Sequence, residues 1–202
     1  MDRKLIALGA LLAAGLIVAP ALTTIDAHAD SSVGDSSKDK TKPLSDADQD
    51  FLKEAAIGGM AEVEMGKLAV TKGSRDDVKK FGQKMIDDHT KAGDKLTELA
   101  TKKGFAAPKQ LDKKHADMLD HLGKLSGKDF DSMYVQHMVS DHDDDVAKFE
   151  KESTKADDAD VRTFASNTLP VLQGHQKLIK AIDAKMKADE KKGWGGGPSP
   201  KK

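Results

Sequence analysis

Between residues 44 and 190, apolar side chains recur at steps of three and four residues, and charged residues fill the positions between them. This spacing is typical of amphipathic helices, and no comparable run alternates between apolar and polar residues as a strand would. We therefore expect an all-α protein. The pattern divides the chain into helical segments at residues 46–72, 75–103, 111–124, 128–155 and 158–189.

Residues that favour helix ends separate these segments. Ser45 has the position of an N-cap, Gly73-Ser74 is typical of a helix end followed by a new N-cap, and Gly104 and Ser126-Gly127 interrupt the pattern further on. Four long segments, two pairs of them joined by tight turns, predict an antiparallel four-helix bundle, with the extra short helix between the second and third long helices. Gly58-Gly59 weakens the first helix, and close approach of a neighbouring helix is the expected reason for it.

The two ends of the chain differ in composition from the helical part. Residues 1–29 have a short charged start, an apolar stretch and a small-x-small site, which together are typical of a secretory signal peptide. An uncleaved N-terminal anchor is the alternative. We expect export to the periplasm or cell envelope and no transmembrane span in the mature chain. The remaining parts are a solvated linker at 30–44, one helical domain at 45–190 and a Gly/Pro/Lys-rich tail at 191–202.

Composition narrows the classes of function. The 33 Lys+Arg and 34 Asp+Glu give a net charge of −1, without the basic excess of a nucleic-acid-binding protein. The absence of cysteine excludes disulfides, thiol catalysis and cysteine-based zinc sites, and it suits an oxidising envelope. No Ser/His/Asp arrangement, phosphate-binding loop or dinucleotide fingerprint is present. We therefore assign no catalytic residue and expect no nucleic-acid partner.

Four ionisable residues fall on the apolar stripes, one near the middle of each long segment: Glu62, His89, His142 and His175. A compact bundle would bring them to similar heights in its core. An unpaired buried carboxylate costs several kcal/mol, and gathering such groups around a cation removes that cost. We therefore interpret the four as candidate ligands of one transition-metal ion, Fe, Zn, Mn or Cu. A hydrogen-bonded or salt-bridged cluster and a histidine pH switch are the alternatives.

An internal repeat relates the second and third long helices. Residues 81–89 and 134–142 share an aromatic residue, Gln, Met, an aliphatic residue and Asp-His at the same spacing. An approximate two-fold axis would place His89 and His142 opposite each other. Met85 and Met138, one turn before these histidines, are core residues or additional ligands that would favour copper. The run Asp143-Asp144-Asp145 is expected to be solvated surface.

Several longer motifs occur in the same segments: Gly59-Met60-Ala61-Glu62-Val63-Glu64, Met85-x-x-Asp88-His89-Thr90, Asp141-His142 and Thr168-Leu169-Pro170-x-Leu172-x-x-His175. Together they resemble the bacterial exported family called domain of unknown function 4142, over about residues 46–185. The resemblance implies a ferritin-like four-helix bundle in the periplasm or envelope, and it implies no activity. The Glu-x-x-His pattern of di-iron bundles is absent, because Ile86, Val139 and Leu172 stand three residues before the histidines.

The sequence leaves three functions open. The first is binding or sequestration of a metal ion by the four core residues. The second is a non-catalytic envelope stress or interaction module, with a buried polar cluster and with charged faces and tails that make peripheral envelope contacts. The third is an oxidoreductase that uses a bound metal to process peroxide or dioxygen.

Overall fold

The computed structural model describes residues 43–192, so the predicted signal peptide, nearly all of the linker and the tail beyond Lys192 lie outside the described residues. Within 43–192 the chain is helical and has no strand, which confirms the all-α prediction. No helix in this part is long and apolar enough to cross a membrane. The helices are α1 (Asp46–Lys72), α2 (Asp76–Lys103), α3 (Lys113–Gly123), α4 (Gly127–Lys155) and α5 (Ala159–Lys191).

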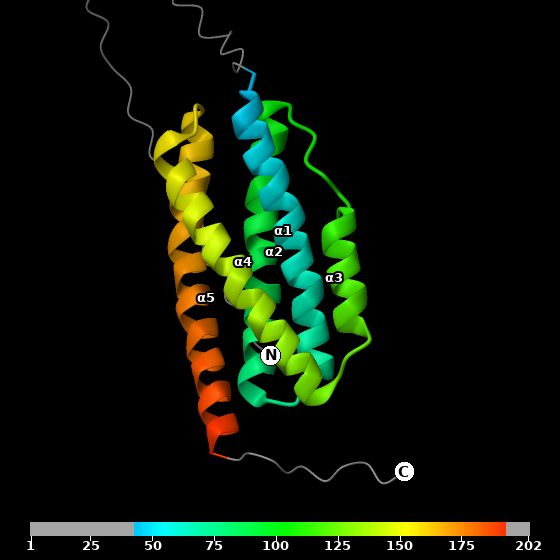
Figure 1. Cartoon of the computed structure of the whole chain (residues 1–202). Helices are drawn as coiled ribbons and strands as arrows, with labels where there is room; N and C mark the ends of the chain where they lie inside the picture. Colours follow the sequence, from blue (N-terminus) through cyan, green and yellow to red (C-terminus); the bar gives the residue numbers. More distant parts are fainter. Residues whose placement is uncertain (1–42, 193–202) are drawn as a thin grey trace, which may run out of the picture. The chain divides into compact units, whose positions relative to one another are not determined.

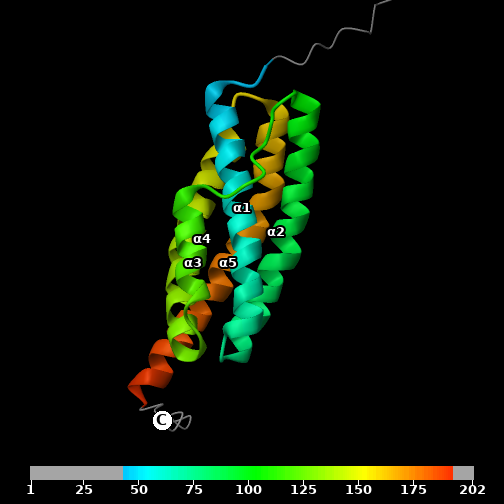
Figure 2. The same ribbon diagram turned by 90° about the vertical axis from the view of Figure 1, so that its right-hand side faces the viewer.

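The four long helices form an antiparallel bundle, in which α1 packs along α2 and α4 packs along α5 (Figure 1). Because α2 also contacts α5 and α1 contacts α4, each long helix lies between two that run in the opposite direction (Figure 2). The chain leaves α2 at one end of the bundle and begins α4 at the other, and α3 covers this distance against α1 and α4. Ferritin-like bundles also have one long crossover. Membership of that fold group stays a prediction.

Two buried aspartates tie the helical hairpins to each other. Asp131 on α4 accepts hydrogen bonds at 3.1 Å from the backbone N–H groups of Ser74 and Arg75, in the turn between α1 and α2, and another from the Ser74 hydroxyl. Asp48 on α1 accepts two, at 3.0 and 2.8 Å, from backbone N–H groups of the α4–α5 turn. The predicted N-cap at Ser74 is wrong, because Arg75 occupies the N-cap position of α2. The hydroxyl of Ser74 is instead hydrogen-bonded to Asp131.

The helices α1 and α2 are in close contact at Gly66 and Gly82, and not at the predicted pair Gly58-Gly59. A Cβ atom on Gly66 would lie 2.6 Å from the carbonyl oxygen of Gly82, and a Cβ atom on Gly82 would lie 2.8 Å from that of Gly66. A Cβ atom on Gly58 would meet nothing within 4 Å, and one on Gly59 would meet only Nδ1 of His89, at 3.8 Å. The interpretation of Gly58-Gly59 as a helix contact is therefore wrong.

Two apolar clusters fill the interior, one toward each end of the bundle. In α2, α4 and α5 a buried histidine separates the two clusters, and in α1 the buried Glu62 lies at the edge of the first cluster. The fold thus places one polar layer between two dry layers. The first cluster includes Met65, Phe81, Met85, Tyr134, Met138 and Ile179, and the second includes Phe51, Leu52, Leu96, Phe149, Phe164 and Leu172.

Candidate metal centre

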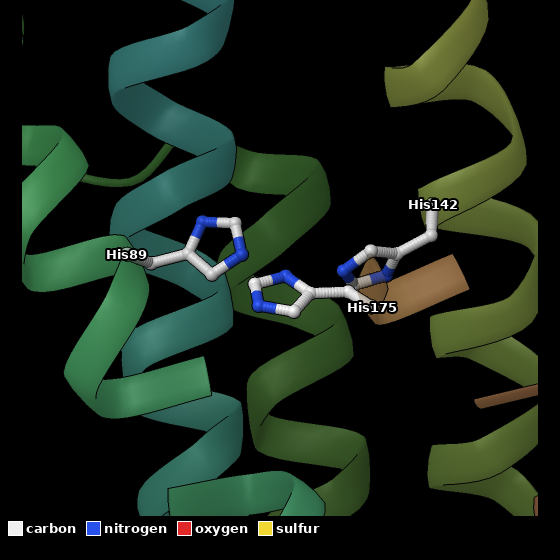
Figure 3. A group of neighbouring side chains, drawn as sticks. All are labelled: His89, His142 and His175. Atoms are coloured by element: carbon white, nitrogen blue, oxygen red, sulfur yellow. The ribbon is translucent and has the colours of Figure 1, made fainter. Parts of the chain in front are cut away.

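The structure brings the three predicted histidines together in the polar layer. The side chains of His142 and His175 are fully buried, and that of His89 is 7% exposed. The centroids of the three rings lie 5.3 to 6.0 Å apart, and each ring offers one nitrogen that lies within 4.8 Å of the nitrogens of the other two. Figure 3 shows the three rings directed into a common space. The expected approach of His89 and His142 is therefore present.

Glu62 joins the histidines from α1, the long helix that carries none of them. Its side chain is 1% exposed, Oε2 lies 2.8 Å from Nδ1 of His89, and Oε1 lies 3.4 Å from Nε2 of His142. Neither carboxylate oxygen has a hydrogen-bond partner, because these contacts lack the geometry of a hydrogen bond. Burial raises the pKa of Glu62 to about 8, while the nearby His142 opposes the shift. The carboxyl group is consequently protonated at neutral pH unless a cation stands beside it.

Outer hydrogen bonds orient two of the three imidazoles. Nδ1 of His142 donates to the backbone carbonyl of Met138, and Nε2 of His175 donates to Oδ2 of Asp88, both at 2.9 Å. A neutral ring has one protonated nitrogen, so the lone pairs lie on Nε2 of His142 and Nδ1 of His175. Both of these atoms are buried without a partner. Metal-binding histidines are usually held in this way, with the second nitrogen bonded to a carbonyl or carboxylate.

Two of the three histidines, His89 and His175, are in the charge state that binds metals. Burial lowers the pKa of His175 to about 4, although its hydrogen bond to Asp88 acts in the other direction. Burial also lowers the pKa of His89. Both rings are therefore neutral at physiological pH, and a neutral imidazole can donate a lone pair to an ion without first losing a proton.

Five buried polar atoms of these four residues lack a hydrogen-bond partner among the described residues. Each such atom costs about 1–3 kcal/mol, so the cluster as it stands requires a further partner that the described side chains do not supply. A cation bound by imidazole and carboxylate fits this donor set. The atoms are both carboxylate oxygens of Glu62, Nε2 of His89, Nε2 of His142 and Nδ1 of His175.

The two methionines lie beside this layer as part of the first apolar cluster. Met85 and Met138 are fully buried there, and Met138 serves the cluster through its backbone carbonyl. Hydrophobic packing accounts for the burial of both side chains. Their role as thioether ligands stays a prediction.

Asp145 is a member of the site that the sequence interpretation missed. It offers a carboxylate oxygen within 4.8 Å of oxygens of Glu62 and Asp141, so its assignment to solvated surface is wrong. Burial raises the pKa of Asp145 well above its ordinary value, and Glu62 and Asp141 raise it further. One signal was available, because Asp145 follows Asp141 by one helical turn and the two share a face of α4. Asp143 and Asp144, by contrast, do lie toward solvent, the first paired with Lys180 at 2.6 Å.

A cavity of about 600 Å³ gives access to the site from the side of α1 and α2. Gly58 and Gly59, where no side chain projects, form part of its wall, and the connection at 107–111 forms another part. The cavity reaches Glu62, His89 and Asp145, whereas His142 and His175 are not among its lining residues. An ion or a water molecule can thus approach the cluster from one side, while the other side stays closed.

The fold and the site together define a four-helix bundle with a buried histidine and glutamate cluster at its centre. The chain belongs to the family described as domain of unknown function (DUF4142), which matches residues 33–182. Among curated proteins, none matches the chain.

Solved structures with a similar fold include two proteins of another family, DUF305, and a copper protein. A DUF305 fragment from Deinococcus radiodurans has a TM-score of 0.61 at 11% identity, over 70% of this chain and 97% of that one. CopM in its Cu(II)-bound form has a TM-score of 0.56 at 18% identity, over 67% and 94%. A DUF305 protein from Streptomyces coelicolor, described as a predicted secreted protein, has a TM-score of 0.59 at 14% identity, over 69% and 91%. At these low sequence identities, the similarity shows that the chain shares their fold and nothing further.

Proposed function

We propose that this protein binds one transition-metal ion through Glu62, His89, His142 and His175, and that it serves the cell envelope as an exported metal-binding or sequestering protein. The observation that carries the proposal is the set of five buried, unpartnered atoms on these four residues. A polar cluster that existed for stability alone would satisfy its own atoms, since unsatisfied buried groups are costly. Here the donors and acceptors approach one another without forming hydrogen bonds.

The donor set suits a borderline ion. Imidazole nitrogens favour Zn, Cu, Fe and Ni, and one carboxylate adds the charge that a divalent ion requires. Such an ion supplies Lewis acidity or redox chemistry when it is bound. The chain contributes a polar layer between two apolar ones, two oriented rings and a carboxyl group, Glu62, that would give up its proton when a cation enters. CopM, which shares the fold, is described as a Cu(II)-bound protein, so Cu(II) is the first ion to test.

Export is the second part of the proposal. The composition of residues 1–29 supports it, as does the description of the similar Streptomyces coelicolor protein as predicted to be secreted. Fractionation of the native host followed by N-terminal sequencing of the mature protein tests it. Recovery in the envelope or periplasmic fraction is expected, and recovery in the cytoplasm with an intact N-terminus would contradict it.

Elemental analysis tests metal binding directly. Protein purified without a histidine tag from its own envelope is expected to contain about one copper, zinc or iron ion per chain, and the His89→Ala/His142→Ala double variant is expected to lack that ion. The matched control is His115→Ala/His121→Ala, which removes two histidines of α3 that lie outside the cluster. A substoichiometric metal content that the first double variant leaves unchanged would refute the proposal. If chelation also left the melting temperature unchanged, the interaction-module interpretation would be preferred.

A further inference from the structure

The carboxylate side of the cluster forms a second group of potential ligands. Glu62, Asp141 and Asp145 each offer one oxygen, and these oxygens lie within 4.8 Å of one another. Glu62 belongs to this group and to the histidine cluster, and both of its oxygens are buried and unpartnered. A carboxylate with two free oxygens between two sets of ligands can bridge two ions.

The nearby positive charge is not available to neutralise the three carboxyl groups. Lys148 is the basic side chain whose charge acts on Asp141 and Asp145, but its Nζ lies 2.6 Å from Oε2 of Glu54. Within residues 43–192, the side chains of Asp141 and Asp145 form no hydrogen bond and no ion pair. Three carboxylates this close repel one another strongly when they are partly buried. The group therefore offers three oxygen ligands at a spacing that suits a divalent cation, whose charge would offset the repulsion between the deprotonated forms.

We propose that Glu62, Asp141 and Asp145 form a second cation subsite, next to the histidine subsite and sharing Glu62 with it. The three oxygen ligands select a hard divalent cation of the Mg²⁺ or Mn²⁺ kind, whereas the three imidazoles select a borderline ion such as Cu²⁺ or Zn²⁺. The cavity reaches Glu62 and Asp145, so water molecules can complete the coordination of a hard cation there. This inference rests on the proposed function only for the ion in the histidine subsite.

Electron paramagnetic resonance of the full mature chain provides the test. The metal-free protein first receives one equivalent of Cu²⁺, which the imidazole ligands should take, and is then titrated with Mn²⁺. We expect the signal of free aqueous Mn²⁺ to be suppressed up to one equivalent. We also expect the Cu²⁺ signal to broaden and lose intensity during the same titration, because two paramagnetic ions that share a carboxylate couple magnetically.

Two double variants on α4 distinguish specific Mn²⁺ binding at the subsite from general attraction of Mn²⁺ to negative charge. Loss of a supporting residue around a metal commonly weakens binding about 10–100-fold, so loss of two ligands in Asp141→Asn/Asp145→Asn should weaken Mn²⁺ binding at least about tenfold. The control, Asp143→Asn/Asp144→Asn, removes the same number of carboxyl groups from the same helix but leaves the three ligands in place. It should bind Mn²⁺ as the wild type does. The single variant Asp145→Asn is the second test if the double variant does not fold.

The outcomes distinguish this inference from the proposed function. If Cu²⁺ binds but Mn²⁺ stays free, or if bound Mn²⁺ leaves the Cu²⁺ signal unchanged, the second subsite is refuted and the histidine site stands. Equal Mn²⁺ affinity in the two double variants would also refute the subsite. If Cu²⁺ does not bind, the proposed function fails, and the Mn²⁺ titration of the metal-free variants then decides the carboxylate subsite alone.

Discussion

Nε2 of His175 on α5 lies 2.9 Å from Oδ2 of Asp88 on α2, so a partly exposed carboxylate outside the cluster orients a ring inside it. Nζ of Lys84 lies 2.7 Å from the same oxygen. Burial raises the pKa of Asp88, but the hydrogen bonds from Lys84 and His175 outweigh this and lower it. Asp88 is therefore charged at neutral pH and accepts the Nε2 proton, which leaves the lone pair of His175 on Nδ1.

Substitution of Asp88 should weaken metal binding although it removes no ligand. Without the carboxylate the ring can rotate and can place its proton on either nitrogen, so we expect Asp88→Ala to reduce Cu²⁺ affinity about 10–100-fold. Competition with a chelator of known affinity measures the change. Asp87→Ala is the matched control, because Asp87 is the preceding, exposed residue, and its affinity should equal that of the wild type. Equal affinities for all three proteins would show that Asp88 does not position the ring.

Metal binding should release a proton from Glu62. Burial raises the pKa of this carboxyl group to about 8, and an ion that binds to it displaces the proton. Calorimetric titration with Cu²⁺ at pH 7, repeated in buffers of different ionisation enthalpy, should report close to one proton released per ion. The number should fall well above pH 8, and it should fall at pH 7 in Glu62→Gln. Release of the same number of protons by this variant would assign them to other groups.

The stability of the metal-free protein should decrease as the pH rises from about 6.5 to about 8. The pKa of Glu62 is raised from 4.5 to about 8 on folding, so its contribution is complete below the unfolded value and is lost as the pH rises through the folded value. The burial that lowers the pKa of His175 from 6.5 to about 4 acts oppositely, but only below pH 6.5. Above that pH the slope belongs to the carboxyl groups and is at most about 1.4 kcal/mol per pH unit for each.

Urea unfolding at several pH values measures this slope. Glu62→Gln should show a smaller slope between pH 6.5 and 8 than the wild type, because glutamine does not titrate. Saturating metal should reverse the trend in the wild type, since the ion binds the deprotonated carboxylate. A free energy of unfolding that increases with pH over this interval in the metal-free wild type would contradict the raised pKa.

The sequence was sufficient to predict the helices and the four central side chains, because both depend on periodicity along a single segment. Glu62 and the three histidines interrupt apolar stripes that are visible in the sequence of each helix alone, without any knowledge of how the helices pack. Asp145 and the close contact at Gly66 and Gly82 depend instead on the rotation and axial position of one helix against another. A charged run such as 143–145 looks solvated along the chain, and only the packing of α4 against α1 turns its last member inward.

Two alanine substitutions on α1 should change stability in opposite directions. Gly66→Ala places a Cβ atom 2.6 Å from the carbonyl oxygen of Gly82, so the helices must separate, and we expect a loss of about 1–3 kcal/mol. Gly58→Ala meets no atom within 4 Å and should gain about 0.5–1 kcal/mol from the better helix propensity of alanine. Urea unfolding with circular dichroism checks both. If Gly58→Ala were as destabilising as Gly66→Ala, the close contact would extend further along α1 than the structure places it.

Narrowing the cavity at Gly59 should slow metal uptake more than it weakens metal binding. A Cβ atom there lies 3.8 Å from Nδ1 of His89, an ordinary contact, so the branched side chain of Gly59→Val would occupy the access route without displacing the ligand ring. Stopped-flow mixing with Cu²⁺ should give an association rate several-fold below that of the wild type, while the equilibrium affinity changes less. Gly174→Val, next to His175 but with open space around its Cβ position, controls for the cost of valine in a helix. Equal association rates for the two variants would mean that ions reach the cluster by another route.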